Sequence, residues 1–136
     1  MSRTKQFRIA IRNRPGAVAE IARTLGNAKI NILALLGTAQ GTAGTVQFVV
    51  EDSGRAKKAL DEAKISYEEM PAEQFELPNK AGTLAEYLEN LAARSVSLNS
   101  IYATAHTDGK SVTVVYSVEA EGAAAAAAVT KAATAR

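Results

Sequence analysis

The chain of 136 residues contains no cysteine and no tryptophan, and only 5% of its residues are aromatic. The absence of cysteine excludes disulfides, cysteine-ligated clusters and thiolate chemistry, and it favours a cytoplasmic location. No apolar run reaches the roughly 20 residues that a membrane-spanning helix needs. The first residues are polar and basic and show no secretory signal. The remaining composition, 47% hydrophobic and 22% charged, is typical of a globular protein.

Residues for catalysis are scarce as well. His106 is the only histidine, and it has no Asp/Glu pair at metal-ligand spacing beside it, so neither a metal site nor a nucleophilic triad is expected. The Gly/Thr-rich segment 37–44 lacks the Gly-Lys-Ser/Thr ending of a phosphate-binding P-loop. The sequence therefore predicts no catalytic residue, no metal and no cofactor, and it indicates a binding protein rather than an enzyme.

What the chain does have is an internal repeat. When the sequence is laid over itself so that Asn13 falls on Asn79, the two copies match without a gap. The other identical pairs include Gly16 with Gly82, Glu20 with Glu86, Val46 with Val112, and Val49 with Val115. Each copy, about 60 to 66 residues long, would be marginally stable alone. We therefore expect the copies to pack together or against a second chain.

Alternating and helical spacings of apolar residues predict the order β-α-β-β-α-β. The first copy is expected to hold strands at 7–11, 30–36, 46–50 and 65–70, helices at 18–25 and 55–64, and a flexible hairpin connection at 37–44. The second is expected to hold strands at 74–77, 96–103 and 112–118, a turn at 108–109, and helices at 84–91 and 123–135. Only Pro71-Ala72 serves as a linker. This predicts an α+β fold of two tandem ferredoxin-like units, the second lacking its last strand.

A loop motif follows the first strand of each copy. Copy one reads Asn13-Arg14-Pro15-Gly16-Ala17, with Asn31-Ile32 at the expected start of its second strand, and copy two reads Asn79-Lys80-Ala81-Gly82. This pattern resembles the ACT domain, a small amino-acid-sensing module attached to many enzymes of amino-acid metabolism. The resemblance spans roughly residues 5–135, with units at 5–72 and 73–136. Copy two departs from the family pattern at Ala81 and at Ser97-Leu98.

The resemblance implies that an amino-acid effector is held at an interface between two domains. The matching positions are Asn13, Arg14, Pro15, Gly16, Ala17, Asn31, Ile32, Asn79 and Gly82. Physical chemistry supports such a role for the first loop, because glycine lets the backbone approach a ligand and a helix N-terminus attracts a carboxylate. Asn13 and Asn31 each carry a donor and an acceptor. We expect Asn31 to lie across from the loop, so that both amides converge on one zwitterion.

Structural explanations compete at each position. Asn13 and Asn79 suit helix N-caps, Pro15 suits a first helical turn, and the amide of Asn31 could bind backbone inside its apolar run. Glu20 and Glu86 are expected to be solvated. The basic stripe of Arg3, Lys5, Arg8, Arg12 and Arg14 is either a solvated strand face or an anion-binding surface. An RNA-binding module of the same element order would need strand aromatics, but in copy one the third strand offers only Phe48 and the second strand offers none.

These observations together predict a regulatory protein that binds an amino acid or a related metabolite and has no enzyme activity of its own. Its uncovered edge strands favour a homodimer. One alternative is an interaction module that modulates a partner enzyme without binding a ligand. A weaker alternative is a nucleic-acid binder that uses the arginine stripe. No membrane association is expected.

Overall fold

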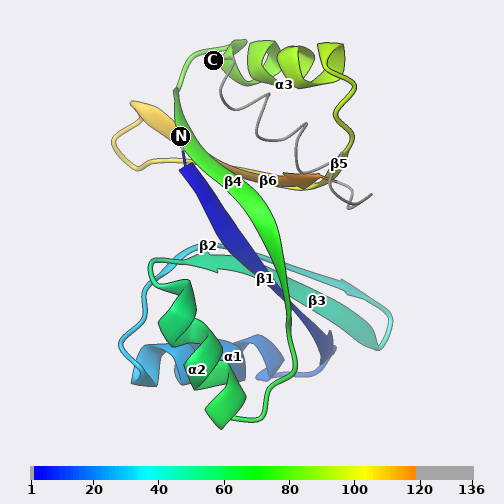
Figure 1. The fold of residues 1–136 in the computed structure, drawn as a ribbon, viewed down its shortest axis with the longest axis vertical. Coiled ribbons are helices and arrows are strands. Elements are labelled where there is room, and N and C mark those ends of the chain that lie inside the picture. The colour runs from blue at the N-terminus through cyan, green and yellow to red at the C-terminus, as the bar shows by residue number, and fades with distance from the viewer. Residues whose placement is uncertain (1, 119–136) are drawn as a thin grey trace. The chain divides into compact units, whose positions relative to one another are not determined.

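The computed structural model describes residues 2–118 and has an α+β architecture, as the sequence predicts (Figure 1). The expected helix at 123–135 lies outside the described residues. The elements are β1 (Ser2–Arg12), α1 (Ala17–Asn27), β2 (Ile32–Gln40), β3 (Ala43–Val50), α2 (Ser53–Glu62), β4 (Glu68–Pro78), α3 (Thr83–Ala93), β5 (Leu98–Ala105) and β6 (Ser111–Val118).

The six strands have the sheet order β2-β3-β1-β4-β6-β5. Two hairpins, β2–β3 and β5–β6, are antiparallel, and β3 and β6 pair antiparallel with β1 and β4. The chain divides into two compact units. One is formed by residues 5–70, and the described part of the other is formed by residues 2–4 and 71–118. We call them the first and the second unit.

The first unit buries one face of its strands under α1 and α2 (Figure 1). The alternation that predicts a half-buried β1 is confirmed, since Phe7 and Ile9 are buried. The ring of Phe7 stacks on that of Phe48 with centroids 5.5 Å apart. Leu25 from α1 and Leu60 from α2 complete the same core, which shows how the helical spacing of apolar residues positions both helices.

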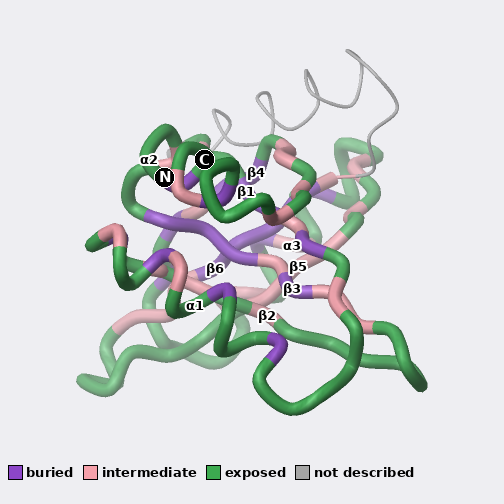
Figure 2. The backbone as a smooth tube through the Cα atoms, turned by 90° about the horizontal axis from the view of Figure 1, so that it is seen from below, coloured by how far each residue is buried: buried purple, intermediate pink, exposed green. Residues whose placement is uncertain are grey.

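The second unit has a separate core under α3. Phe75 on β4, Tyr87 on α3 and Tyr116 on β6 form its aromatic centre, and the ring centroids of Phe75 and Tyr87 are 4.3 Å apart. Buried stretches in both units lie mainly on the strands, whereas the loops are exposed (Figure 2). Each copy of the repeat therefore organises its own hydrophobic core.

Strand β4 corrects one expectation about the junction of the copies. The predicted strands at 65–70 and 74–77 are parts of one strand, Glu68–Pro78, and Pro71-Ala72 is not a linker. The division between the units falls inside this strand, between Met70 and Pro71. Proline lacks the backbone N–H of a ladder hydrogen bond, which makes a break look plausible in the sequence, but a strand tolerates it where that donor is not needed.

The start of β1 belongs to the second unit. In the first unit, β4 lies next to β1, as the fourth strand of this fold does. In the second unit the latter part of β4 is the counterpart of β1, and residues 2–4 lie beside it in the sheet order. An ion pair joins them, with Arg3 Nε 3.7 Å from Glu73 Oε1. Residues 2–4 thus occupy the position of the fourth strand, which the second copy was predicted to lack.

The hairpin of the first copy is tighter than predicted. Instead of a flexible connection at 37–44, β2 continues to Gln40 and β3 begins at Ala43, which leaves only Gly41-Thr42 between them. Gly41 has φ +62°, a conformation that suits a two-residue hairpin turn. The small and β-branched residues of this segment are compatible with strands once a neighbouring strand provides the hydrogen bonds.

Strand pairing also shows that the repeat is not free of gaps. Phe7 pairs with Phe48. Glu73, the counterpart of Phe7 in the ungapped repeat, pairs with Tyr116 instead of Val114, the counterpart of Phe48. The second hairpin is therefore longer by two positions, which lie in the turn between Ala105 and Ser111. The expected matches of β3 residues with β6 residues, such as Val46 with Val112, are consequently wrong by two positions.

Candidate functional site

The loop between β1 and α1 is shaped by Asn13 and Gly16. Gly16 caps α1 in the left-handed conformation, with φ +86° and no side-chain cap, so the expectation that Asn13 is the N-cap is wrong. The Asn13 side chain instead donates through Nδ2 to the carbonyl oxygen of Gly41, at 2.9 Å. Its backbone N–H donates to Thr42 O, also at 2.9 Å. Asn13 thereby fastens the loop to the β2–β3 turn.

The second copy repeats this arrangement. Gly82 caps α3 with φ +93°, and Asn79 is likewise not the N-cap. Asn79 Nδ2 donates to Gly109 O at 3.0 Å, and its backbone N–H donates to Lys110 O at 3.0 Å. Because both asparagines bind hairpin carbonyls in the same way, joining loop and turn is a structural function of the motif itself.

An open surface hollow of about 780 Å³ adjoins the first loop. It is lined by Arg14, Pro15, Gly16, Ala19, Glu20, Ala22, Arg23 and Thr24. Arg14 Nη2 lies 2.8 Å from Glu20 Oε1, and both side chains are about half exposed, at 47% and 64%. The Arg14 guanidinium also donates to Pro15 O at 3.2 Å. The hollow thus presents a cation already paired with a carboxylate.

Asn31 and Ile32 lie elsewhere in the first unit. Asn31 is exposed rather than enclosed in an apolar run, and it precedes β2, which begins at Ile32. Its backbone N–H donates to Glu51 Oε1 at 3.3 Å, and its carbonyl accepts from Glu51 N at 3.2 Å. The explanation that treats Asn31 as a buried structural amide is therefore wrong.

The register separates Asn31 from the loop. Arg12, at the end of β1, pairs with Ala43 at the start of β3, whereas Ile32 pairs with Val50 at the end of β3. The eight residues of β3 correspond to roughly 20 Å. The expectation that Asn13 and Asn31 face each other across one site is consequently wrong within this unit.

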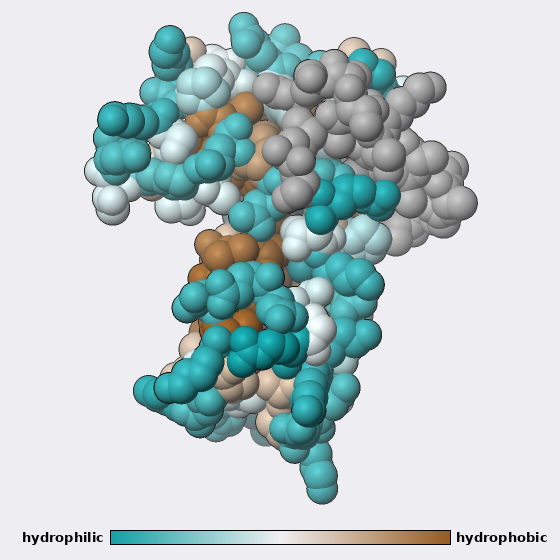
Figure 3. All heavy atoms as spheres, turned by 60° about the vertical axis from the view of Figure 1, so that its left-hand side comes forward, coloured by the Kyte–Doolittle hydropathy of each residue, from teal (hydrophilic) through white to brown (hydrophobic). Residues whose placement is uncertain are grey.

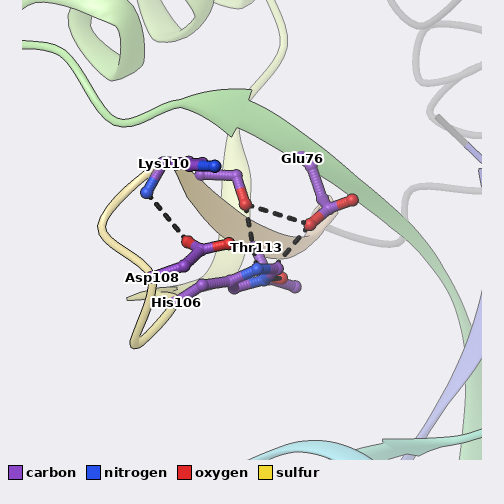
Figure 4. Close-up of polar contacts among 6 residues, drawn as sticks. Glu76, His106, Asp108, Lys110 and Thr113 are labelled. Carbon is purple, nitrogen blue, oxygen red and sulfur yellow. Dashed lines mark hydrogen bonds and ion pairs between the residues drawn. The ribbon is translucent and has the colours of Figure 1, made fainter.

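A polar cluster that sequence analysis missed surrounds His106 (Figure 4). His106 Nε2 lies 2.6 Å from Thr113 Oγ1 and 3.2 Å from Glu76 Oε1, and Nδ1 lies 2.9 Å from Ser111 Oγ. Ser111 Oγ also donates to Glu76 Oε1 at 3.3 Å. Glu76 belongs to a different strand, far from His106 in the sequence, and only the β4–β6 register, which pairs it with Thr113, brings it here.

The structure describes residues 2–118. In that range no three His, Cys, Asp or Glu side chains gather as a metal-binding group. No helix there is long and apolar enough to span a membrane.

Three of the five residues of the basic stripe are paired with acidic residues. Lys5 Nζ lies 2.9 Å from Glu69 Oε1 in the first unit, where Arg14 also pairs with Glu20. Arg3 pairs with Glu73 in the second unit. A phosphate that bound at these three positions would have to compete with the carboxylates.

The repeated loop, the element order and the two cores define two ACT-like, ferredoxin-like units in one chain. No protein-family model matches the sequence, and neither does any curated protein. Solved structures share the fold. Protein BT0572 from Bacteroides thetaiotaomicron is 24% identical with a TM-score of 0.81, over 95% of this chain and 88% of that one. The ligand-free regulatory subunit of aspartate kinase from Thermus thermophilus is 19% identical with a TM-score of 0.64, over 97% and 93%.

Proposed function

We propose that the protein is a regulatory, non-catalytic binding protein that senses an amino acid or a related metabolite through the first loop. The observation that carries this proposal is the hollow at Arg14, Pro15 and Gly16, next to the start of α1. Its neighbours in fold include regulatory subunits of aspartate kinase, from Thermus thermophilus and Thermus flavus. A cytoplasmic location would agree with such a role.

The loop offers what an α-carboxylate requires. The first turn of a helix has backbone N–H groups without intrahelical partners, and the helix dipole is positive at that end. Gly16 has no Cβ. Among the described residues other than its chain neighbours, only Arg14 Nη1 comes within 4 Å of the place of one, at 3.9 Å, so the backbone is accessible. Arg14 adds a guanidinium, which binds carboxylates through charge-assisted hydrogen bonds.

A second chain would account for the remaining residues of the predicted site. Asn31 and Ile32 lie at the opposite end of β3 from the loop, so one unit cannot present both sets to one small ligand. We therefore propose a homodimer in which these residues come to the ligand from the other chain. Strand β2 supports dimerisation, because it ends the sheet, has no charged residue, and exposes Leu33 and Leu35 at 48% and 40%.

The proposal is tested by a thermal-shift screen with the twenty amino acids, followed by calorimetry. A ligand that binds the folded state raises the melting temperature. Arg14→Gln should weaken the binding of the selected amino acid, and Lys80→Gln, at the equivalent position of copy two, is the matched control. If no amino acid or related metabolite raises the melting temperature, the proposed function is wrong.

The exposed leucines also favour a second candidate function, an interaction module that modulates a partner enzyme. Most of the visible surface of the described residues is hydrophilic, with hydrophobic atoms open to view in a few places (Figure 3). Leu33 and Leu35 are close together on an edge strand, which is a common place for another chain to add. A protein that is monomeric by light scattering, near its own 14.3 kDa, and binds no amino acid would favour this candidate.

A further inference from the structure

The two equivalent loops differ in how they are closed. In the second loop, Thr83 Oγ1 lies 2.8 Å from Pro78 O and 3.0 Å from Lys80 O, so its hydroxyl bridges the two ends of the loop. The backbone N–H of Lys80 also donates to Pro78 O, at 2.9 Å. The first loop has Ala17 at the position of Thr83 and therefore has no hydroxyl that could make this bridge.

The β5–β6 turn, which binds the second loop, is also stabilised by hydrogen bonds. Asp108 Oδ1 accepts from Lys110 N at 2.8 Å, and Gly109 N donates to His106 O at 2.9 Å. The His106 side chain is in turn held by Ser111 and Thr113 on β6 (Figure 4). Asn79 binds the carbonyls of this turn. In the first copy only Gly41-Thr42 forms the turn, which has no counterpart of the His106 and Asp108 side chains.

The first loop instead presents the Arg14 side chain to the surface hollow. Arg14 lines it together with Pro15 and Gly16, and its guanidinium is held by Glu20 from the first turn of α1. An exposed ion pair of this kind is weak, typically worth about 0 to 1 kcal/mol. A ligand carboxylate can therefore replace Glu20 at Arg14 at little energetic cost.

We propose that only the first loop binds ligand, one molecule per chain, and that the second loop is a structural anchor that closes its unit. This inference rests on the proposed function for its first half, because it assigns the sensing site to one of the two copies. The ligand chemistry is a carboxylate that displaces Glu20 from Arg14. The assignment of the second loop as an anchor depends only on the contacts of Thr83 and His106, because Asn13 and Asn79 make the same contacts in the two copies.

The experiment exchanges the distinguishing residue between the copies. Thr83→Ala makes the second loop like the first, and Ala17→Thr makes the first loop like the second. Calorimetry with the amino acid selected by the thermal screen is expected to give one site per chain. That site should be lost or weakened at least tenfold in Ala17→Thr and should be unchanged in Thr83→Ala. Ala17→Ser is a smaller replacement that is used if the threonine prevents folding.

Amide hydrogen exchange tests the anchor without any ligand. The Lys80 amide should exchange several-fold more slowly than the Arg14 amide, and Thr83→Ala should remove most of the difference. Two sites per chain, or loss of binding in Thr83→Ala alone, would overturn the assignment to the first loop and leave the sensing function intact. Equal exchange at Lys80 and Arg14 would overturn the anchor. If no amino acid binds at all, the sensing function fails, and the exchange result still decides the anchor.

Discussion

The hydroxyl oxygens of Tyr87 and Tyr116 lie 3.1 Å apart inside the core of the second unit. One hydroxyl donates to the other, so α3 and β6 are joined by a hydrogen bond within an aromatic cluster. Each is also placed by ring contacts with Phe75. The first unit has no tyrosine pair at the equivalent positions, where Ile21 and Phe48 lie.

We expect Tyr87→Phe to lower the free energy of unfolding by about 0.5 to 1.5 kcal/mol, the usual net value of one hydrogen bond. Tyr116→Phe should have a similar effect. The double variant should lose less than the sum of the two, because each single change already breaks the shared bond. Urea denaturation of the four proteins measures this coupling, and strictly additive losses would mean that the two hydroxyls do not interact.

A second prediction separates the loops through their glycines. Gly16 and Gly82 both have positive φ, so alanine at either position should cost about 1 to 2 kcal/mol of stability. Only Gly16→Ala should also weaken amino-acid binding, because its new Cβ would stand beside the hollow. Chemical denaturation and calorimetry of both variants give the comparison. Equal loss of affinity in the two variants would contradict it.

Asn31 yields a prediction about the proposed dimer. Its side chain is exposed, so Asn31→Ala should change the free energy of unfolding of the ligand-free protein by less than about 0.5 kcal/mol. It should weaken amino-acid binding by roughly 1 to 3 kcal/mol, as expected when a polar partner is left unpaired. This loss should appear only at protein concentrations at which light scattering shows a dimer. A loss of affinity in a monomer would contradict the shared site.

The buried carboxyl of Glu73 should make the stability of the protein depend on pH. Its side chain is 1% exposed, and desolvation raises its pKa above the ordinary value, although the charge of Arg3 acts in the opposite direction. A carboxyl with a raised pKa in the folded state stabilises the protein while it is protonated, and this contribution is lost as the pH rises through the folded-state pKa.

We therefore expect Glu73→Gln to melt at a higher temperature than the unmodified protein at neutral pH. The difference should shrink as the pH is lowered toward the ordinary pKa range of a carboxyl. Thermal melts from acidic to neutral pH measure it, with exposed Glu86→Gln as the control on the same unit. A Glu73→Gln protein that melts lower at every pH would mean that the Arg3 ion pair outweighs desolvation.

The ends of the helices give a stability prediction. Lys29, directly after the C-cap of α1, has φ +62°, a left-handed conformation that is unfavourable for a residue with a Cβ. Its N–H donates to Gly26 O at 3.0 Å, and the next N–H donates to Leu25 O, so the conformation is needed to end the helix. Lys29→Gly should stabilise the protein by about 0.5 to 1 kcal/mol. Lys29→Ala should have little effect, and an equal gain in both variants would show that the side chain, not the backbone, is responsible.

Much of the fold is predictable from the sequence because local patterns and the global structure agree. The alternation of Phe7 and Ile9 and the helical spacing of Ile21 and Leu25 place the same residues in the core that the structure buries. Helix α1 was expected at 18–25 and extends from Ala17 to Asn27. These patterns depend on one face of an element being buried, which is a local property of the chain.

The site was less predictable, because its geometry depends on register. The sequence places Asn13 and Asn31 in one family motif, but the order of pairing along β3 puts them at opposite ends of a strand. The His106 cluster also depends on register, since Glu76 reaches it only through pairing with β6. The longer turn of the second hairpin is easily overlooked in the sequence, because Val46 falls on a valine whether it is aligned with Val112 or with Val114.

Residues 2–4 make contacts with a part of the chain that is synthesised much later. Arg3 meets Glu73 only after the whole first unit has followed it, whereas residues 5–70 can already contact one another. During translation the first unit can therefore form before the second. Residues 2–4 can contact β4 only after β4 has been synthesised. Contacts so distant in sequence are slow to form. In a kinetic folding experiment, the closure of this strand pair should belong to a late step.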